Sequence, residues 1–407
     1  MEVKRITQRI KSIDIFRGLC MVWMIANHLI AWWLNRDYLW IHKLAIMIID
    51  PIGVSGFLFI SGVSIAISYR RRMRKTKISE DYNYRMIRTS HLLRALLLFI
   101  VAISYNVPIT VWSHDPKMLW SWFVLQTAAI SLFLTWPFLK SHKLFRIIIA
   151  TLIIIFQQFV IILLRPYQGD SNLLGALFHL LYNPKDQDPI LVFFPFFLIG
   201  TIIGDIIYKT IYERNDDIHN IKIIKKHIFN VLKIGMFLIA LGVLLSFAKF
   251  LAGFEKFLTR KKLLFSLTDI NFYGSYLDRQ TLSWIIYSLG IDLVLLSILL
   301  LCEFSERFKV KKSYKFIFYY SYYSLTIYLA HNIFFFLFLN QLDPIIFSFV
   351  GVIAFISMGV VLRGIYKIWG WRASIKAIIS KLSQFLTLKI EVRKERNIKR
   401  ESLKKIL

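Results

Sequence analysis

Long apolar runs are the feature of this sequence that most narrows the folds open to it. The chain has 407 residues, 57% of them hydrophobic, and its mean hydropathy is +0.57. A helix needs about 20 apolar residues to cross the hydrocarbon core of a bilayer, and the runs are continuously apolar rather than alternating, which argues against a transmembrane β-barrel. The sequence therefore predicts an all-α polytopic integral membrane protein with about ten spans. They lie near residues 13–34, 44–68, 92–113, 118–138, 145–164, 190–208, 230–252, 281–302, 316–339 and 344–363.

The distribution of charge favours a membrane topology over nucleic-acid binding. The formal net charge is +28, but the basic residues gather in alternate connections between the predicted spans. This alternation is the positive-inside pattern, and it predicts that both termini are cytoplasmic. The connection 253–280 departs from it, because its basic residues lie on the predicted outer side. We expect a lipid bilayer and no nucleic acid as partner. The basic clusters are at 4–11, 70–77, 140–146, 222–226, 309–312 and 389–407.

The spans divide the chain into a transmembrane domain, 1–363, and a basic cytoplasmic tail, 364–407. We expect the tail to be solvated or to contact lipid headgroups, and the protein to be a multi-pass protein of the cell membrane. The sequence leaves homo-oligomerisation open. Cys20 and Cys302 fall in or at the end of apolar runs and form no disulfide framework. The histidines show no zinc-ligand spacing, so we expect no metal.

The first predicted span, which contains "SIDIFRGLCMVWMIANHL" (12–29), carries three ionisable residues: Asp14, Arg17 and His28. A charge at the bilayer centre costs roughly 2.5–3.5 kcal/mol on insertion scales, so such residues suggest a functional site. Eleven residues of helix turn through about 1,100° and rise about 16 Å, which leaves Arg17 and His28 about 20° apart on one face. Asp14 is spaced to pair with Arg17. The sequence therefore predicts a polar cavity along this face, with the ion pair at the cytoplasmic boundary and the imidazole near mid-membrane.

A purely structural interpretation of the same residues is also available. Arg17 is close enough to the helix end to be a snorkelling anchor, with Asp14 as its surface partner. His28 is compatible with a hydrogen-bonded packing role between helices.

The second predicted span, "DPIGVSGFLFISGVSIAIS" (50–68), begins with Asp50 and Pro51 and is rich in glycine and serine, Ser61 among them. Small residues let helices approach closely, which is their usual role in membranes. An acid and a proline inside an apolar run indicate irregular backbone, which is tolerated where it lines a cavity or is buried in protein.

These two segments resemble a known group of membrane enzymes. The spacing from Arg17 to His28 is the Arg-x10-His pattern of the acyltransferase type 3 proteins, and "GVSGFLFISG" (53–62) is similar to an element of their second helix. "KSIDIFRG" (11–18) is still closer to the opening of the heparan-α-glucosaminide N-acetyltransferase catalytic region. Later elements of the wider transmembrane acyltransferase superfamily are similar to "WFVLQTAAISLF" (122–133), "FFPFFLIGTIIGD" (193–205) and "YSLTIYLAHN" (323–332).

The resemblance implies transfer of an acyl group, usually acetyl from cytoplasmic acetyl-CoA, to a carbohydrate or other envelope acceptor at the opposite face. It makes 1–363 an acyltransferase domain and carries the essential Arg and His over to Arg17 and His28. The heparan enzymes use a histidine in the segment after the first span, and His42 lies in that segment here. At the place of His28 the heparan enzymes have an asparagine, and here Asn27 is the adjacent residue. His28 and His42 are therefore both candidates for the essential histidine.

A chemical division of labour follows from these residue types. His28 titrates near neutral pH and fits a general base or an acyl carrier. Arg17, oriented by Asp14, fits the CoA phosphates. The basic residues of 70–77 and of the third span, Arg88 among them, have the charge to attract the nucleotide portion of CoA. They are equally explained by the positive-inside pattern alone.

Two further polar residues are candidate binding residues. Gln126 lies within the fourth predicted span and His331 near the outer end of the ninth, where each fits either a substrate contact or packing. A transporter or flippase of an envelope precursor, with the ionisable residues of the first span lining its path, is the alternative from another class. A scaffold without activity is a third possibility.

Overall fold

The computed structural model describes residues 9–77, 83–183, 187–212, 217–247, 279–304 and 314–406, and all regular structure within these ranges is helical. Eight helices in them are long and apolar enough to cross a membrane. This confirms the all-α polytopic fold. The long helices are α2 (Lys11–Trp33), α4 (Val54–Lys75, extended by the turn that begins at Asp50), α5 (Tyr84–Ser113), α7 (Lys143–Leu164), α9 (Ile190–Tyr212), α10 (Asp217–Phe247), α12 (Leu282–Glu303) and α15 (Pro344–Ile368).

Two predicted spans are built differently from the expectation. The span 118–138 is a short helix, α6 (Val124–Thr135), with 3-10 turns η3 (Pro116–Trp120) and η4 (Trp136–Lys140) at its two ends. The span 316–339 is divided into α13 (Tyr314–Tyr322), α14 (Ser324–Ala330) and the 3-10 turn η7 (His331–Phe336). Apolar composition predicts that a segment lies in the membrane, but it does not require one continuous helix. The helix can be interrupted where neighbouring protein forms hydrogen bonds with the exposed backbone groups.

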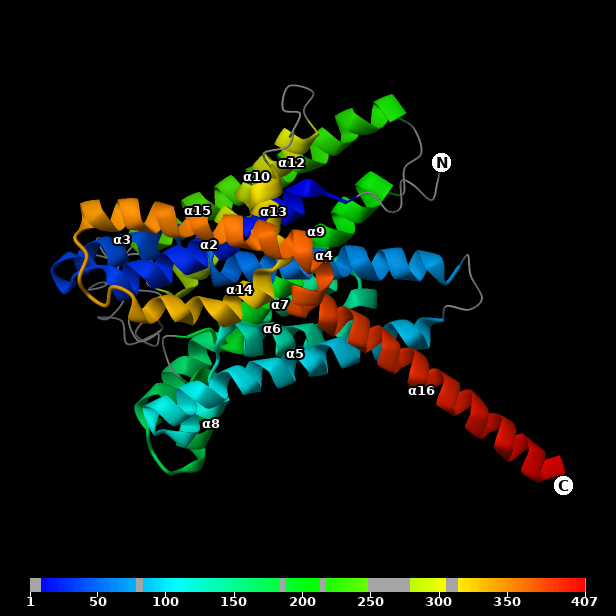
Figure 1. Ribbon diagram of the computed structural model, residues 1–407. Coiled ribbons are helices and arrows are strands. Elements are labelled where there is room, and N and C mark those ends of the chain that lie inside the picture. Colours follow the sequence, from blue (N-terminus) through cyan, green and yellow to red (C-terminus); the bar gives the residue numbers. More distant parts are fainter. Residues whose placement is uncertain are drawn as a thin grey trace, which may run out of the picture.

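The remaining described helices are shorter or terminal. α3 (Leu39–Ile49) and α8 (Leu173–Tyr182) lie at one end of the bundle, and α16 (Ile375–Ile406) leaves the other end (Figure 1). Neither α8 nor the helical character of the tail was predicted. Most of the connection 253–280 and the cluster 309–312 lie outside the described residues.

The predicted second span is interrupted at the expected place. α3 ends at Ile49, the 3-10 turn η2 (Asp50–Ile52) follows, and α4 begins after Gly53. Pro51 has no N–H to continue the helical bonding. Farther along α4, a Cβ on Gly62 would overlap the carbonyl oxygen of Phe197. The predicted close helix contact is therefore the contact of α4 with α9.

Both ends of α2 are fixed by distant parts of the chain. At its start, the Glu303 carboxylate accepts hydrogen bonds from the backbone N–H groups of Lys11 and Ser12, at 2.9 and 2.7 Å, which also suits the positive end of the helix dipole. At its far end, the Trp33 carbonyl accepts from Leu342 N at 2.9 Å. α2 is thus held across the whole membrane, and the faces it presents are fixed.

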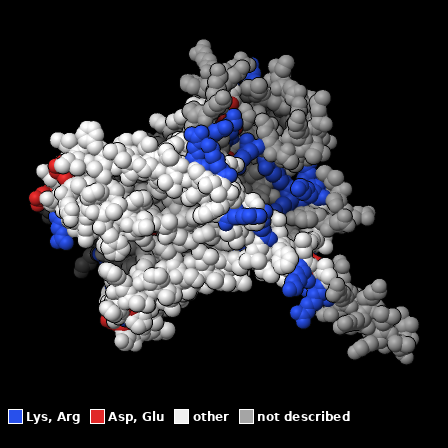
Figure 2. Space-filling view, viewed as in Figure 1, with Lys and Arg blue, Asp and Glu red and all other residues white. Residues whose placement is uncertain are grey.

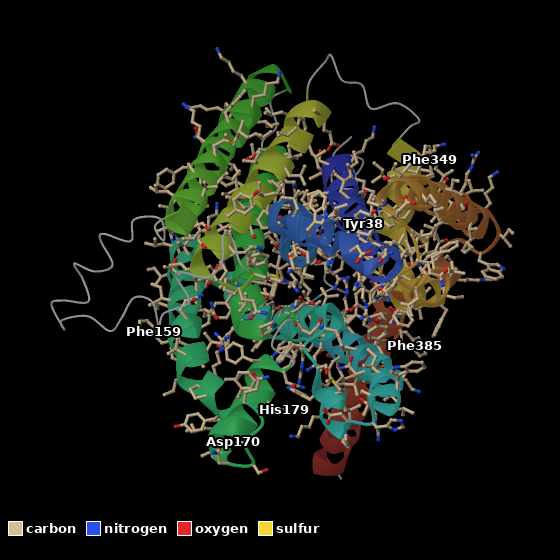
Figure 3. The ribbon with its side chains drawn as sticks, turned by 90° about the vertical axis from the view of Figure 1, so that its left-hand side faces the viewer. Tyr38, Phe159, Asp170, His179, Phe349 and Phe385 are labelled. Atoms are coloured by element: carbon tan, nitrogen blue, oxygen red, sulfur yellow. The ribbon has the colours of Figure 1, made fainter. Side chains whose placement is uncertain are left out.

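Charge marks the two ends of the bundle. Lys and Arg gather at the right-hand end in Figure 2, and a broad belt without charged side chains separates them from a smaller group of acidic and basic residues at the left. Seen from that left-hand end, Phe159 of α7 and Phe349 of α15 lie on opposite flanks (Figure 3), and their exposed fractions are 51% and 69%. These residues suit contact with lipid tails. The positive-inside rule places the basic end in the cytoplasm; the opposite end is called the far face below.

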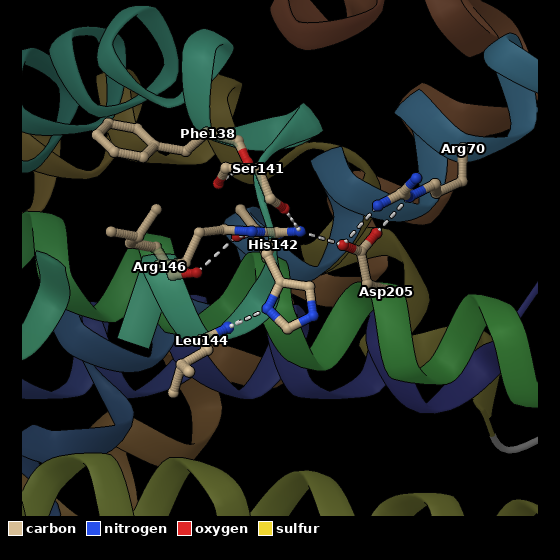
Figure 4. A network of polar contacts seen from close by, with 9 residues as sticks. Arg70, Phe138, Ser141, His142, Leu144, Arg146 and Asp205 are labelled. Carbon is tan, nitrogen blue, oxygen red and sulfur yellow. Dashed lines mark hydrogen bonds and ion pairs between the residues drawn. The ribbon is translucent and has the colours of Figure 1, made fainter. Parts of the chain in front are cut away.

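A buried ionic network ties three helices together near the cytoplasmic end (Figure 4). Asp205 of α9 accepts two hydrogen bonds from Arg70 of α4, at 2.7 and 2.9 Å, and one from Arg146 of α7, at 2.5 Å. Arg146 also donates to the Ser141 carbonyl at 3.1 Å. The network fixes the end of α4 from which Arg71 enters the cavity described next.

Candidate active site

A cavity of about 300 Å³ opens among α2, α4, α5, α6, α14 and α16 near the cytoplasmic end. Its lining combines apolar residues with five cationic side chains and a single carboxylate, that of Asp14. A cavity in which cationic side chains outnumber carboxylates to this degree favours a polyanionic ligand. The cationic residues are Arg9, Arg17, Arg71, Arg94 and Lys376.

Arg17 faces this cavity, as the sequence predicted, and contacts Ser64 as well as Asp14. Its Nη2 donates to Ser64 Oγ at 2.5 Å, whereas its Nη1 lies 3.9 Å from Asp14 Oδ1. Asp14 is bound chiefly by Arg9, through a contact with Nε and a 2.8 Å hydrogen bond from Nη2. A planar guanidinium matches a carboxylate best through two parallel hydrogen bonds, and Arg9 has that geometry. The predicted ion pair of Asp14 with Arg17 is therefore present, and Ser64 adds a shorter contact to Arg17.

Lys376 reaches the cavity from the region predicted to be a solvated tail. Burial lowers the pKa of Lys376 well below its ordinary value, and the neighbouring Arg17 and Arg94 act in the same direction. An ammonium held against other cations gains most when an anion binds beside it. The first turns of α16 are therefore part of the site, because tertiary packing brings them against α5 and α14.

One stripe of α2 connects this cavity to the far half of the membrane. Arg17, Met21, Met24 and His28 follow one another at helical spacing on one face. Met21 and Met24 line a second, small cavity of about 20 Å³. The two cavities share the side chains of Phe57, Leu125, Ser324 and Leu325. The linings of the two neighbouring cavities together, called the lined path below, extend along α2 from Arg17 to the turn just before His28.

His28 lies among aromatic rings at the far end of this path. Its ring centroid is 4.9 Å from that of Trp32 and 4.9 Å from that of His331. Tyr328, which lines the small cavity, is one turn before His331, and their ring centroids are 5.5 Å apart. The sequence predicted His28 and His331 separately; the tertiary structure brings them together.

A second pair, formed by His42 and Asn27, lies beside this group. His42 Nε2 and Asn27 Oδ1 form a hydrogen bond of 3.1 Å. Because an amide oxygen only accepts, Nε2 carries the proton of His42 in this arrangement. Burial lowers the pKa of His42, and the nearby Asp50 opposes that change. His42 is therefore held near His28 as a neutral, oriented ring.

Arg279 joins two buried carboxylates beside these histidines. Its Nη2 donates to Asp188 Oδ1 at 2.6 Å, and its Nε lies 3.2 Å from Asp50 Oδ2. The three residues precede α9, α12 and α4, so the contacts fix the starts of three helices. Sequence reasoning missed Arg279 and Asp188, although a charged residue immediately before an apolar run, as each of them is, was the available signal.

Titration of Asp188 should make the stability of the protein depend on pH. Burial raises the pKa of Asp188 from 3.8 to about 6, although the Arg279 guanidinium acts in the opposite direction. The folded state therefore binds this proton more tightly than the unfolded state, and stability should fall as pH rises from about 4 to about 6. A shift of two pKa units corresponds to roughly 3 kcal/mol.

We expect Asp188→Asn to remove this fall in stability between pH 4 and 6. The measurement is the thermal unfolding of detergent-solubilised protein at a series of pH values, with the variant compared with the wild type. Parallel curves for the two proteins between pH 4 and 6 would show that the carboxyl does not titrate there.

The other predicted site residues fall into three places. Ser61 lines the large cavity. Gln126 is fully buried toward the far face, where its Oε1 accepts from Asn106 Nδ2 at 3.1 Å. Arg88 is exposed on α5, and Arg94, about 120° away around that helix, enters the cavity in its place. Within the described residues no group of three His, Cys, Asp or Glu side chains has the arrangement to hold a metal ion.

The fold and the site define a polytopic membrane protein in which a cationic cavity leads to a buried cluster of histidines. A family model for the catalytic region of heparan-α-glucosaminide N-acetyltransferase matches residues 9–234. The chain belongs to this family of membrane acetyltransferases, which confirms the predicted resemblance. Comparisons with curated proteins and with solved structures returned no match.

Proposed function

We propose that this protein transfers an acetyl group from cytoplasmic acetyl-CoA to an amine or hydroxyl of a glycan or other envelope acceptor at the far face. The observation that carries the proposal is the lined path along α2, from the five cationic side chains to the turn before His28. It supplies a polyanion site at one end, and the base-rich centre lies one helical turn beyond Met24 at the other. Family membership supports the reaction class.

In this proposal the CoA phosphates bind the cationic end of the cavity. Arg17, held by Ser64, and Arg94 and Lys376 supply charge there. The pantetheine arm then follows the stripe of Met21 and Met24. This arrangement presents the thioester to His28, which acts as general base or acyl carrier.

The acceptor approaches from the opposite side of the same centre. Asn27 and His42, which are hydrogen-bonded to each other, and Asp50 are proposed to contact it, together with His331 and Gln126. The family name specifies an α-glucosaminide as acceptor of its founding enzyme, so an amino sugar is the first probe to use.

The test is transfer across a membrane by the purified protein in liposomes. Acetyl-labelled acetyl-CoA is supplied on one side and methyl α-D-glucosaminide is enclosed on the other, with protein-free liposomes as control. We expect label in the enclosed sugar and free CoA outside. Movement of the sugar across the membrane without acetylation would instead support a transporter, and absence of both donor binding and transfer would overturn the proposal.

A further inference from the structure

His331 is held in one tautomer by the backbone. Its Nδ1 lies 2.5 Å from the carbonyl oxygen of Tyr328. A carbonyl oxygen only accepts hydrogen bonds, so Nδ1 must carry the proton. In the neutral ring the lone pair is then on Nε2, at the side of the imidazole away from that carbonyl.

The Nε2 atom is buried and has no hydrogen-bond partner among the described residues. The whole residue is only 2% exposed. Leaving a buried acceptor without a partner costs roughly 1–3 kcal/mol, and a fold that keeps such an atom beside the proposed reaction centre offers a place for a substrate proton. The neighbouring rings of His28 and Trp32 are 4.9 and 5.8 Å away, centroid to centroid.

The surroundings of His331 fix its position against α2. Trp33 Nε1 donates to the Phe334 carbonyl at 2.8 Å, and Asn340 N donates to the Trp32 carbonyl at 2.8 Å. Asn332 Nδ2 donates to Tyr105 Oη at 2.8 Å. The turn η7 is thus bound to α2 on one side and to α5 on the other, so the imidazole is preorganised rather than free to rotate away.

We propose that His331, rather than His28, is the general base of the acceptor half-reaction; the inference rests on the proposed function. Nε2 takes the proton of the acceptor amine or hydroxyl as that nitrogen or oxygen bonds to the acetyl carbon. The bond from the acetyl carbon to its carrier atom breaks, and the carrier atom, the CoA sulfur or an acylated imidazole nitrogen, keeps the electron pair. The imidazolium then returns the proton to the leaving group. Of the two roles proposed for His28, the acyl-carrier role is the one that this assignment leaves.

The experiment compares two acceptors that differ in their need for a base. His331→Asn retains an N–H that can donate to the Tyr328 carbonyl but lacks the basic nitrogen. We expect transfer to methyl α-D-glucosaminide to fall by roughly 10²–10⁴-fold. We expect the loss with hydroxylamine, a strong nucleophile that is uncharged at pH 7, to be much smaller. His331→Ala should show the same difference between the two acceptors, and added imidazole should restore part of its transfer to methyl α-D-glucosaminide.

Two controls separate this inference from others. Binding of labelled acetyl-CoA should be unchanged in both variants, which shows that they fold. Equal losses with the two acceptors, or no loss with either, would overturn the base role of His331. The base role would pass to His28 if His28→Ala alone showed the difference between acceptors. Failure of the wild type with both acceptors would instead refute the proposed function.

Discussion

Replacement of His28 by alanine is expected to lower acetyl transfer by at least roughly 10²–10⁴-fold, the contribution of a single positioned proton-transfer group. His28 is the residue on the α2 stripe that follows Met24, and its ring contacts those of both Trp32 and His331. An acyl carrier at this place, the role that the assignment of His331 leaves to His28, has no substitute on the same helix. The expected loss is in kcat, because Arg17 and the cationic cavity remain intact.

The measurement is transfer of labelled acetyl to methyl α-D-glucosaminide, together with acetyl-CoA binding by the same preparation. His114→Asn is a matched control, because His114 is exposed at the far face and its φ of 52° is one that asparagine tolerates. His28→Ala with normal donor binding and normal transfer would exclude His28 from the chemistry and return His42 to consideration.

Replacement of Arg17 should weaken donor binding rather than the chemical step. Arg17 is 8% exposed and lines the cavity among four other cations. Losing one partner of a buried, hydrogen-bonded charge pair costs roughly 2–5 kcal/mol, which is about 30- to several thousand-fold in affinity. We therefore expect the KM for acetyl-CoA to rise by that range, with a much smaller change in kcat.

Arg17→Gln is the preferred variant, since its amide can still donate to Ser64 and so preserves the packing of α2 on α4. Arg88→Ala serves as control: it removes the same charge from α5 at an exposed position and should change the KM less than threefold at physiological salt, because exposed charges are screened. Equal effects of the two substitutions would mean that the cavity responds to net charge alone and that Arg17 is no specific anchor.

Several features of the site were predictable because they lie on one helix. The periodicity of α2 fixed the common face of Arg17 and His28, and α2 is continuous over Lys11–Trp33. Pro51 and its neighbours likewise predicted the break before α4. The closest contact of Asp14 was not predictable in this way. Arg9 lies outside the regular helix and comes closer to Asp14 than Arg17 does, because no helical period fixes where a residue outside the helix reaches.

The sequence by itself determined an all-α membrane protein and the stripe on α2, and it predicted which end faces the cytoplasm. These follow from apolar length, from charge asymmetry and from the fixed turn of a helix, all of which are local properties. Only the tertiary structure decided that His331 stands beside His28, that Lys376 of the tail enters the cavity, and that Arg279 joins Asp50 to Asp188. Each of these contacts joins residues far apart in the chain. Their meeting depends on how helices pack around each other, which no local pattern encodes.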